Sequence, residues 1–577
     1  MHKIKRSTLL INGFSQLSVA YFLSFYAAIS QAMEELPLLN TYQPYGLYSG
    51  AQFKFLYAQQ DCKDCQTVSQ ALWYFKDEPI LVAADNSKIA GFDAKKTPMQ
   101  DIEDAKIMNK GNTLPPLIWI SSNEMMVGKF SAEKQYAINY TLTQNTTMHV
   151  LPNRVKKSPL FLVDKIATNL SFWNEKTEAF FDNKSIIARG ETTNLGFMAR
   201  TIWPTDFKLD LHADAKPLAN SETLRNLVMF ENGGAQSAFE SRKLWQKTAH
   251  NIPSSYVHPH AEKAVLGIIL NGAQGDDDEA HGGHFAVATG KISFDGGINN
   301  WLVNNYYNLA SNSEKGIIAA PTPLDNYFAD VNSGQSYYRP SYMLVAVFNQ
   351  DTVPARFQAA TNRIYNHFYS GNLVYDHSRN NCAGITIDTF RELGWHIPER
   401  SIEGRLKALG AYFYVSIKEQ DLAKGRNIYD YLTTEKTRLF PAVTFDAMGE
   451  DLLQWTRQLH IDHTPATAFT KQLSNDIEAI YFVRIPQIPS SRAFGLAPVY
   501  GFDAYLKQAP ENRANWKIVP TTDNILPKAL KNGLLIQEEK ASLVPLPIAI
   551  VLGINLMVFV LLVRKIRQFS HQFKSKS

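Results

Sequence analysis

The chain has 577 residues, a length that usually corresponds to two to four folded domains. Hydrophobic residues make up 45% of the chain and charged residues 19%, which excludes a protein that is disordered throughout. The net charge of +4 is not concentrated in a basic stripe, so the composition argues against a nucleic-acid partner.

The first 32 residues indicate a secretory signal peptide. Three basic residues between positions 3 and 6 precede an apolar stretch over 17–29, and Ser30-Gln31-Ala32 has the small-x-small pattern of a cleavage site. We therefore expect residues 1–32 to be removed after Ala32. An uncleaved N-terminal anchor is the alternative interpretation.

Residues 33–250 predict a mixed region that is rich in strands. Three segments carry β-branched and aromatic residues at nearly alternating positions, as strands do: 115–122, 136–143 and 146–152. Two later segments have the spacing of short helices: 221–230 and 237–247.

Cysteine use depends on the compartment. Cys62 and Cys65 are close enough to form a disulfide in an oxidising compartment, and a local structural disulfide is favoured over a redox C-x-x-C site. Cys382 is then left over. A leftover thiol outside the cytoplasm is either reactive or buried and inert.

A boundary is predicted at the proline-containing stretch 251–260, followed by a separate unit over 255–400. In the strand-like sequence HFAVATG, His284 shares one face with Ala286 and Ala288. These small side chains leave room beside the imidazole, either for a substrate or for packing. If residues 290–291 form a two-residue turn, Asp295 lies diagonally from His284 and can orient its ring.

The segment 379–395 predicts a helix that opens on a cysteine. Asn381 is a good N-cap, the helix is expected over 382–393, and Gly394 supplies its end. Cys382 thus lies in the first turn, where the helix dipole and free N–H groups favour a thiolate. A cysteine at a helix start and a histidine on a strand are what a cysteine acyl-enzyme mechanism requires.

The C-terminal part indicates a membrane tether. Residues 401–540 alternate helical patterns with extended, proline-bearing segments and form an extension whose fold the sequence does not assign. Residues 543–563 carry no charge and are long enough to span a bilayer as a helix. The tail 564–577 is basic and is therefore expected to be cytoplasmic, with residues 33–540 outside the cytoplasm.

The order of HFAVATG and, about a hundred residues later, NNC opening a helix resembles the circularly permuted NlpC-type papain-like cysteine hydrolases and acyltransferases. Among these, the segment 255–400 most resembles the N-terminal periplasmic domain of the Lnb family of bacterial lipoprotein N-acyltransferases. The resemblance implies an α+β fold with a permuted papain-like core, Cys382 as nucleophile, His284 as base and Asp295 as third member. It also implies a lipid- or lipoprotein-linked substrate and a periplasmic location on the inner membrane, held by one C-terminal transmembrane helix.

Three alternatives remain. A cell-wall peptide amidase or peptidase would use the same Cys–His pair, and an envelope protein with an inactive fold would only bind. A zinc site is the third, because His258, His260, His281 and His284 flank or follow the acidic run 276–279. That run also fits a solvated loop, HExxH is absent, and no P-loop or dinucleotide fingerprint is found. We therefore expect neither a metal nor a cofactor.

Overall fold

The computed structural model describes residues within 44–523. The described ranges are 44–56, 79–84, 115–122, 124–129, 140–142, 146–151, 161–163, 175–193, 196–219, 223–230, 236–247, 258–273, 281–307, 311–312, 320–331, 333–369, 373–457, 467–489, 495–508, 512–515 and 522–523. They all belong to the first of two compact units, Met1–Leu534 and Leu535–Ser577. The expected signal peptide 1–32, the Cys62–Cys65 pair, the segment 543–563 and the tail 564–577 lie outside these ranges.

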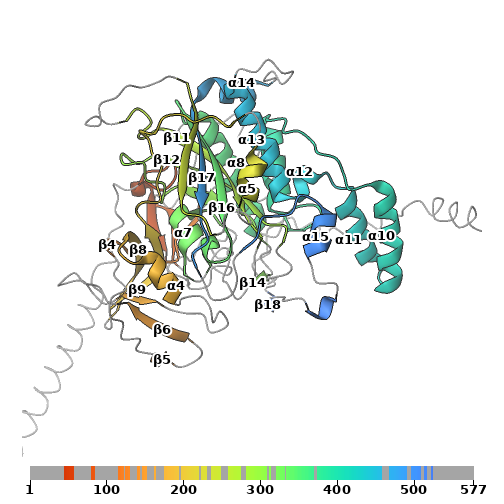
Figure 1. Cartoon of the computed structure of the whole chain (residues 1–577), viewed down its shortest axis with the longest axis horizontal. Helices are drawn as coiled ribbons and strands as arrows, with labels where there is room; N and C mark the ends of the chain where they lie inside the picture. Colours follow the sequence, from red (N-terminus) through yellow and green to blue (C-terminus); the bar gives the residue numbers. More distant parts are fainter. Residues whose placement is uncertain are drawn as a thin grey trace, which may run out of the picture. The chain divides into compact units, whose positions relative to one another are not determined.

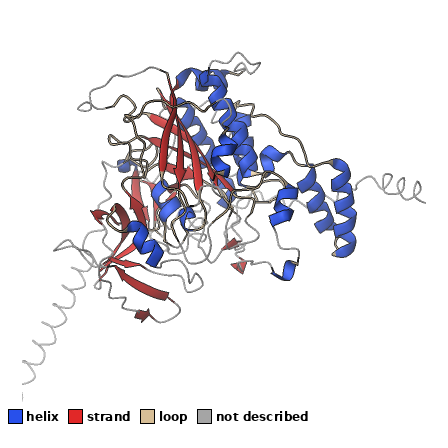
Figure 2. Ribbon diagram, viewed as in Figure 1, coloured by secondary structure: helices blue, strands red, loops and turns tan. Residues whose placement is uncertain are grey.

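The described residues form a mixed α+β structure (Figures 1 and 2). Its largest sheet has seven strands, all antiparallel, in the order β10-β17-β16-β11-β12-β13-β15. In that order the strands are β10 (Glu240–Gln246), β17 (Ile477–Ile485), β16 (Ser341–Phe348), β11 (Ala264–Asn271), β12 (His284–Lys291), β13 (Leu302–Asn304) and β15 (Thr322–Pro323). This sheet positions the candidate site.

The central strands are buried on both faces. Every residue of β11 and β16 is buried, and their sequences AVLGIILN and SYMLVAVF are nearly continuous apolar runs. Such runs form strands when both sheet faces are covered, because alternation with polar residues is not needed there.

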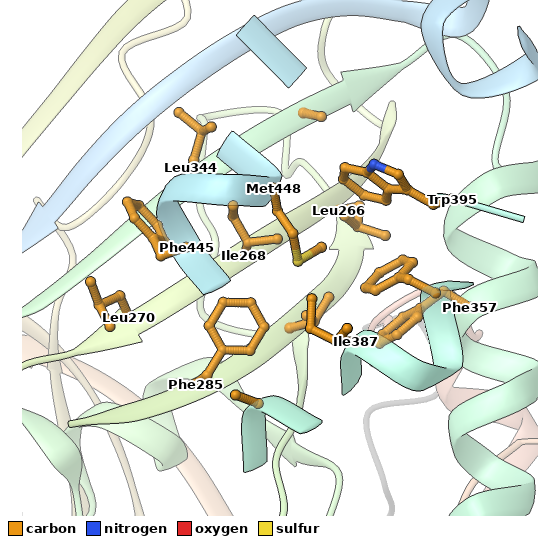
Figure 3. Close-up of a cluster of buried hydrophobic side chains, with 14 of the residues drawn as sticks. Leu266, Ile268, Leu270, Phe285, Leu344, Phe357, Ile387, Trp395, Phe445 and Met448 are labelled. Carbon is orange, nitrogen blue, oxygen red and sulfur yellow. The ribbon is translucent and has the colours of Figure 1, made fainter. Parts of the chain in front are cut away.

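Helices cover one face of the sheet (Figure 3). Phe285 and Ile268 on the strands pack with Phe357 of α8 (Thr352–Tyr369), Ile387 of α9 (Cys382–Leu393) and Phe445 of α13 (Pro441–Arg457). Ile387 is fully buried, so its truncation to alanine is expected to cost about 2–5 kcal/mol. This packing fixes α9, and with it Cys382, against β12.

The opposite face packs on a second core. Ala286, Ala288 and Val345 of the large sheet join Phe197 and Trp203 there. The latter two belong to a six-stranded sheet of order β4-β8-β9-β7-β6-β5. Its strands are β4 (Glu124–Lys129), β5 (Tyr140–Leu142), β6 (Thr146–Leu151), β7 (Phe161–Val163), β8 (Ser185–Thr193) and β9 (Gly196–Pro204).

Smaller elements complete the fold. A three-stranded sheet consists of β1 (Phe53–Leu56), β2 (Ile80–Ala83) and β3 (Ile118–Trp119), and β14 (Ser311–Asn312) pairs with β18 (Thr522–Asp523). The remaining helices are α4 (Glu175–Phe181), α5 (Leu224–Met229), α7 (Leu324–Ala329), α10 (Arg405–Lys418), α11 (Leu422–Thr433), α12 (Lys436–Leu439), α14 (Ala468–Asp476) and α15 (Phe502–Gln508). The 3-10 turns are η1 (Gly50–Gln52), η2 (Gln335–Tyr337) and η3 (Arg513–Asn515).

The sequence predictions hold for several of these elements. The strands expected within 115–122, 136–143 and 146–152 are confirmed, as is the helix within 221–230. The helix expected over 237–247 is wrong, because this segment is strand β10. A bulge between Lys243 and Trp245 breaks the alternation of β10, and its pairing with β17 overrides local propensity.

The large sheet crosses both of the expected domain boundaries. Strand β10 comes from the region 33–250, and β17 comes from the extension 401–540. The unit 255–400 therefore shares one sheet with its two neighbours, and part of the extension that the sequence left unassigned is a strand of that sheet. No helix within the described ranges is long and apolar enough to cross a membrane.

Candidate active site

Helix α9 begins at Cys382, as the sequence predicts. The Asn381 side chain accepts a hydrogen bond from the Gly384 N–H at 2.8 Å, and Gly394 ends the helix with a φ of 106°. Cys382 is buried and forms no disulfide. The helix start and its cap are thus confirmed, and they place the thiol in the first turn.

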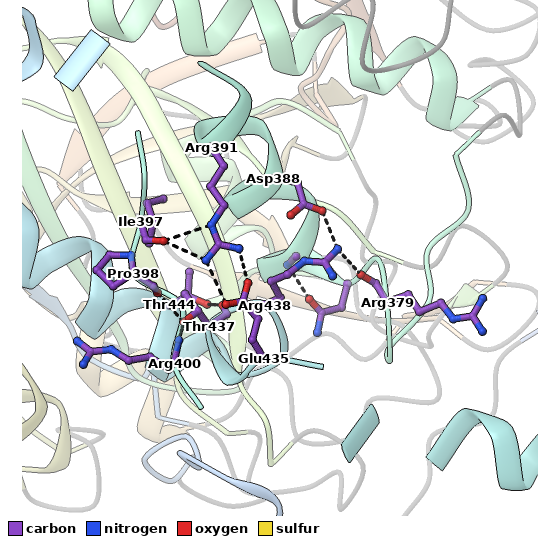
Figure 4. A network of polar contacts seen from close by, with 12 residues as sticks. Arg379, Asp388, Arg391, Ile397, Pro398, Arg400, Glu435, Thr437, Arg438 and Thr444 are labelled. Atoms are coloured by element: carbon purple, nitrogen blue, oxygen red, sulfur yellow. Dashed lines mark hydrogen bonds and ion pairs between the residues drawn. The ribbon is translucent and has the colours of Figure 1, made fainter. Parts of the chain in front are cut away.

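Polar contacts hold α9 in place (Figure 4). The Asn381 amide donates to the Leu439 carbonyl of α12 at 3.0 Å. Arg391 pairs with Glu435 just before α12, and Arg438 of α12 pairs with Asp388 of α9 at 2.6 Å. These contacts restrain both ends of α9 against the following segment, which limits how far Cys382 can move.

Strand β12 begins at His284, again as predicted. Gly283 has a φ of +77°, and a Cβ atom there would lie 2.6 Å from the Asn271 carbonyl oxygen, so only glycine fits before the histidine. The His284 ring is buried and stacks on Tyr307, with 4.1 Å between ring centroids and 10° between planes. Its Nε2 atom has no hydrogen-bond partner among the described residues.

Cys382 and His284 belong to one buried cluster. Phe285, the residue after His284, is buried in the same cluster as Cys382, and Tyr375 packs against that cluster. Tyr307 stacks on His284 and interacts electrostatically with Cys382. The charge of Arg339 acts on both Cys382 and His284. The fold therefore brings together two residues that are about a hundred positions apart in the chain.

The environment favours the uncharged forms of both residues. Burial raises the pKa of the Cys382 thiol, although hydrogen bonds from Phe285 and Tyr375 oppose the shift. Burial and the nearby charge of Arg339 lower the pKa of His284 well below its ordinary value. Burial therefore opposes the thiolate that the helix start was expected to favour. A neutral imidazole is able to accept the thiol proton.

Asp295 does not lie beside His284. Strand β12 continues through the predicted turn to Lys291, and its partner β13 pairs Leu302 with Thr289. The predicted two-residue hairpin is therefore wrong, and Asp295 follows the far end of the strand, about 23 Å along it from His284. Its carboxylate is 65% exposed and lies 3.6 Å from the Lys208 ammonium.

The space expected beside His284 is filled by packing. Ala286 and Ala288 are fully buried within the second core. Their small size serves the contact between the two sheets, so they do not line an open substrate pocket.

The histidines considered for zinc are divided in the structure. His258 and His260 lie together, with 4.7 Å between ring centroids, whereas His281 packs on Tyr505. Within the described ranges, no group of three histidine, cysteine or acidic side chains is arranged to hold a metal ion. The acidic run 276–279 lies outside these ranges.

Three residues of the cluster were missed in the sequence. Arg339 precedes β16, Tyr307 follows β13, and Tyr375 lies before α9. None belongs to a local motif, since each reaches the cluster from a separate segment of the chain. The tyrosine hydroxyls carry hydrogen-bonding capacity into a core that is otherwise apolar.

Comparisons with known proteins add no assignment: no protein-family model matches the chain, and neither a curated protein nor a solved structure matches it significantly.

Proposed function

We propose that the protein is a cysteine-dependent acyltransferase or hydrolase with Cys382 as nucleophile and His284 as general base. One observation carries the proposal: Cys382, at the start of α9, and Phe285, one residue after His284 at the start of β12, pack in the same buried cluster. An antiparallel sheet whose histidine strand packs on a helix that opens with cysteine is what a permuted papain-like core requires. Both residues are buried, so water is largely excluded from the thiol.

The chemistry follows from the two neutral groups. As the Cys382 sulfur attacks the carbonyl carbon of an acyl ester, His284 accepts the thiol proton. The ester C–O bond breaks, and the leaving alkoxide takes this proton from His284, so that a thioester remains on Cys382. An amine, hydroxyl or water then attacks the thioester carbonyl and loses its proton to His284. The C–S bond breaks, and the proton returns to the sulfur.

The substrate is proposed to be a lipid- or lipoprotein-linked acyl group. The reason lies in the sequence. The apolar segment 543–563 would tether the chain to the bacterial inner membrane and hold residues 33–540 on its periplasmic side. A tether raises the effective concentration of membrane-borne substrates at the site.

The test uses the purified full-length chain in detergent. It is incubated with a phospholipid or a lipopeptide, and intact-mass spectrometry detects the gain of one acyl chain. We expect an adduct on Cys382 that Cys382→Ala does not form and that His284→Ala forms at least about 100-fold more slowly, the lower bound for a general base. An exposed histidine variant, His396→Ala, is the matched control and should form the adduct normally.

Two outcomes contradict the acyl transfer. Cleavage of cell-wall peptides without an acyl adduct would make the protein a peptidase with the same Cys–His pair. Adduct formation that is equal in wild type and His284→Ala would remove His284 as the base.

A further inference from the structure

Arg339 is a buried cation at the end of the sheet where His284 lies. It is only 3% exposed and comes two residues before Ser341, the first residue of β16. Ser341 and His284 both pair with Asn271, one from each side of β11. Arg339 therefore precedes β16 at the end of the sheet where His284, the candidate base, begins β12.

The guanidinium of Arg339 has neutral partners only. Its Nε donates to the Gln335 side-chain oxygen at 2.8 Å, and its Nη1 donates to the Gly272 carbonyl at 3.3 Å. The Tyr307 hydroxyl lies beside it. Since arginine has five N–H donors, at least two remain for another acceptor.

Two other buried arginines show what is missing. Arg189 pairs with the Asp325 carboxylate at 2.9 Å, and Arg484 pairs with Glu240 at 2.5 Å. Arg339 forms no ion pair with any described residue. Burying a charged guanidinium without an anion beside it is costly. A ligand that supplies the anion would remove this penalty.

We propose that Arg339 binds the phosphate of a phospholipid acyl donor beside Cys382. Guanidinium groups bind phosphates through paired N–H donors, and Arg339 lies near enough to Cys382 and His284 for its charge to act on both. The choice of a phospholipid rests on the proposed function, whereas the anion site itself does not. The acyl ester and the phosphate of such a donor are only a few bonds apart, which suits one site with a nucleophile and a cation.

The anion site is tested by alkylating Cys382 with two reagents that share a leaving group but differ in charge. The rate with iodoacetate is divided by the rate with iodoacetamide, for the full-length chain and for N-acetylcysteine. We expect the protein ratio to exceed the free-thiol ratio by about tenfold or more, as a nearby cation attracts the anionic reagent. Arg339→Gln should return the ratio to that of the free thiol, and Arg339→Lys should keep most of the preference.

Controls separate the possible failures. Arg405→Gln removes an exposed cation on α10 and should leave the ratio unchanged. A wild-type ratio equal to that of the free thiol would overturn the anion site even if Arg339→Gln fails to fold. If neither reagent labels folded Cys382, the nucleophile and the proposed function fail together with the inference. A tenfold preference without any acyl adduct would retain the anion site and reject the acyl transfer alone.

The kind of anion is tested by protection. Glycerophosphate, which is the headgroup portion of a phospholipid, should slow the iodoacetate reaction of wild type and not that of Arg339→Gln. Protection by a peptide with a free C-terminal carboxylate, and not by glycerophosphate, would overturn the phosphate assignment in favour of a peptide substrate.

Discussion

The cap of α9 offers a quantitative test of how the nucleophile is positioned. Asn381 is buried, its side-chain oxygen accepts the Gly384 N–H at 2.8 Å, and its amide donates to the Leu439 carbonyl at 3.0 Å. Removal of an N-cap costs about 1 kcal/mol, and a lost hydrogen bond to a buried carbonyl adds about 1–2 kcal/mol. We therefore expect Asn381→Ala to lower the free energy of unfolding by about 2–3 kcal/mol.

A second substitution separates the two contributions. Asn381→Ser keeps a side-chain oxygen for the cap but cannot donate to Leu439 in the same way, so a loss of about 1–2 kcal/mol is expected. Urea unfolding is followed by tryptophan fluorescence, to which Trp395, packed edge-on against Phe390 of α9, contributes. Equal losses for the alanine and serine variants would refute the cap, and a loss below about 0.5 kcal/mol for alanine would refute the whole account. Asn427→Ala, an exposed change on α11, is the control.

Two further predictions concern carboxylates. Burial, with the charge of Glu450, raises the pKa of Asp446 to about 7. The folded protein therefore binds an extra proton between about pH 4 and 7, so stability should fall as pH rises through this window. Over this window, the free energy of unfolding of Asp446→Asn should fall by about 1–3 kcal/mol less than that of wild type, as measured by thermal unfolding at each pH. Parallel pH profiles for the two proteins would contradict the raised pKa of Asp446. Asp295→Asn should change the free energy of unfolding by no more than about 0.5 kcal/mol, since the ion pair of Asp295 with Lys208 lies on the surface. The rate of Cys382 alkylation should also stay the same. A tenfold slower alkylation would return Asp295 to the site.

The sequence determined the local features of this protein. Asn381, Cys382 and Gly394 predicted the limits of α9, because capping and helix termination depend on residues a few positions apart. The apolar run from His284 likewise predicted the start of β12. These signals concern backbone geometry, which neighbouring residues largely decide.

Only the tertiary structure decided which residues meet. The turn after β12 could not be derived from residues 290–291, because the pairing with β13 and the contact between two sheets extend the strand and carry Asp295 away. Arg339, Tyr307 and Tyr375 join Cys382 from separate segments. Burial, which raises the pKa of Cys382 against the helix dipole, is likewise a sum over many distant side chains. Long-range pairing and desolvation therefore lie beyond what local spacing in a single sequence determines.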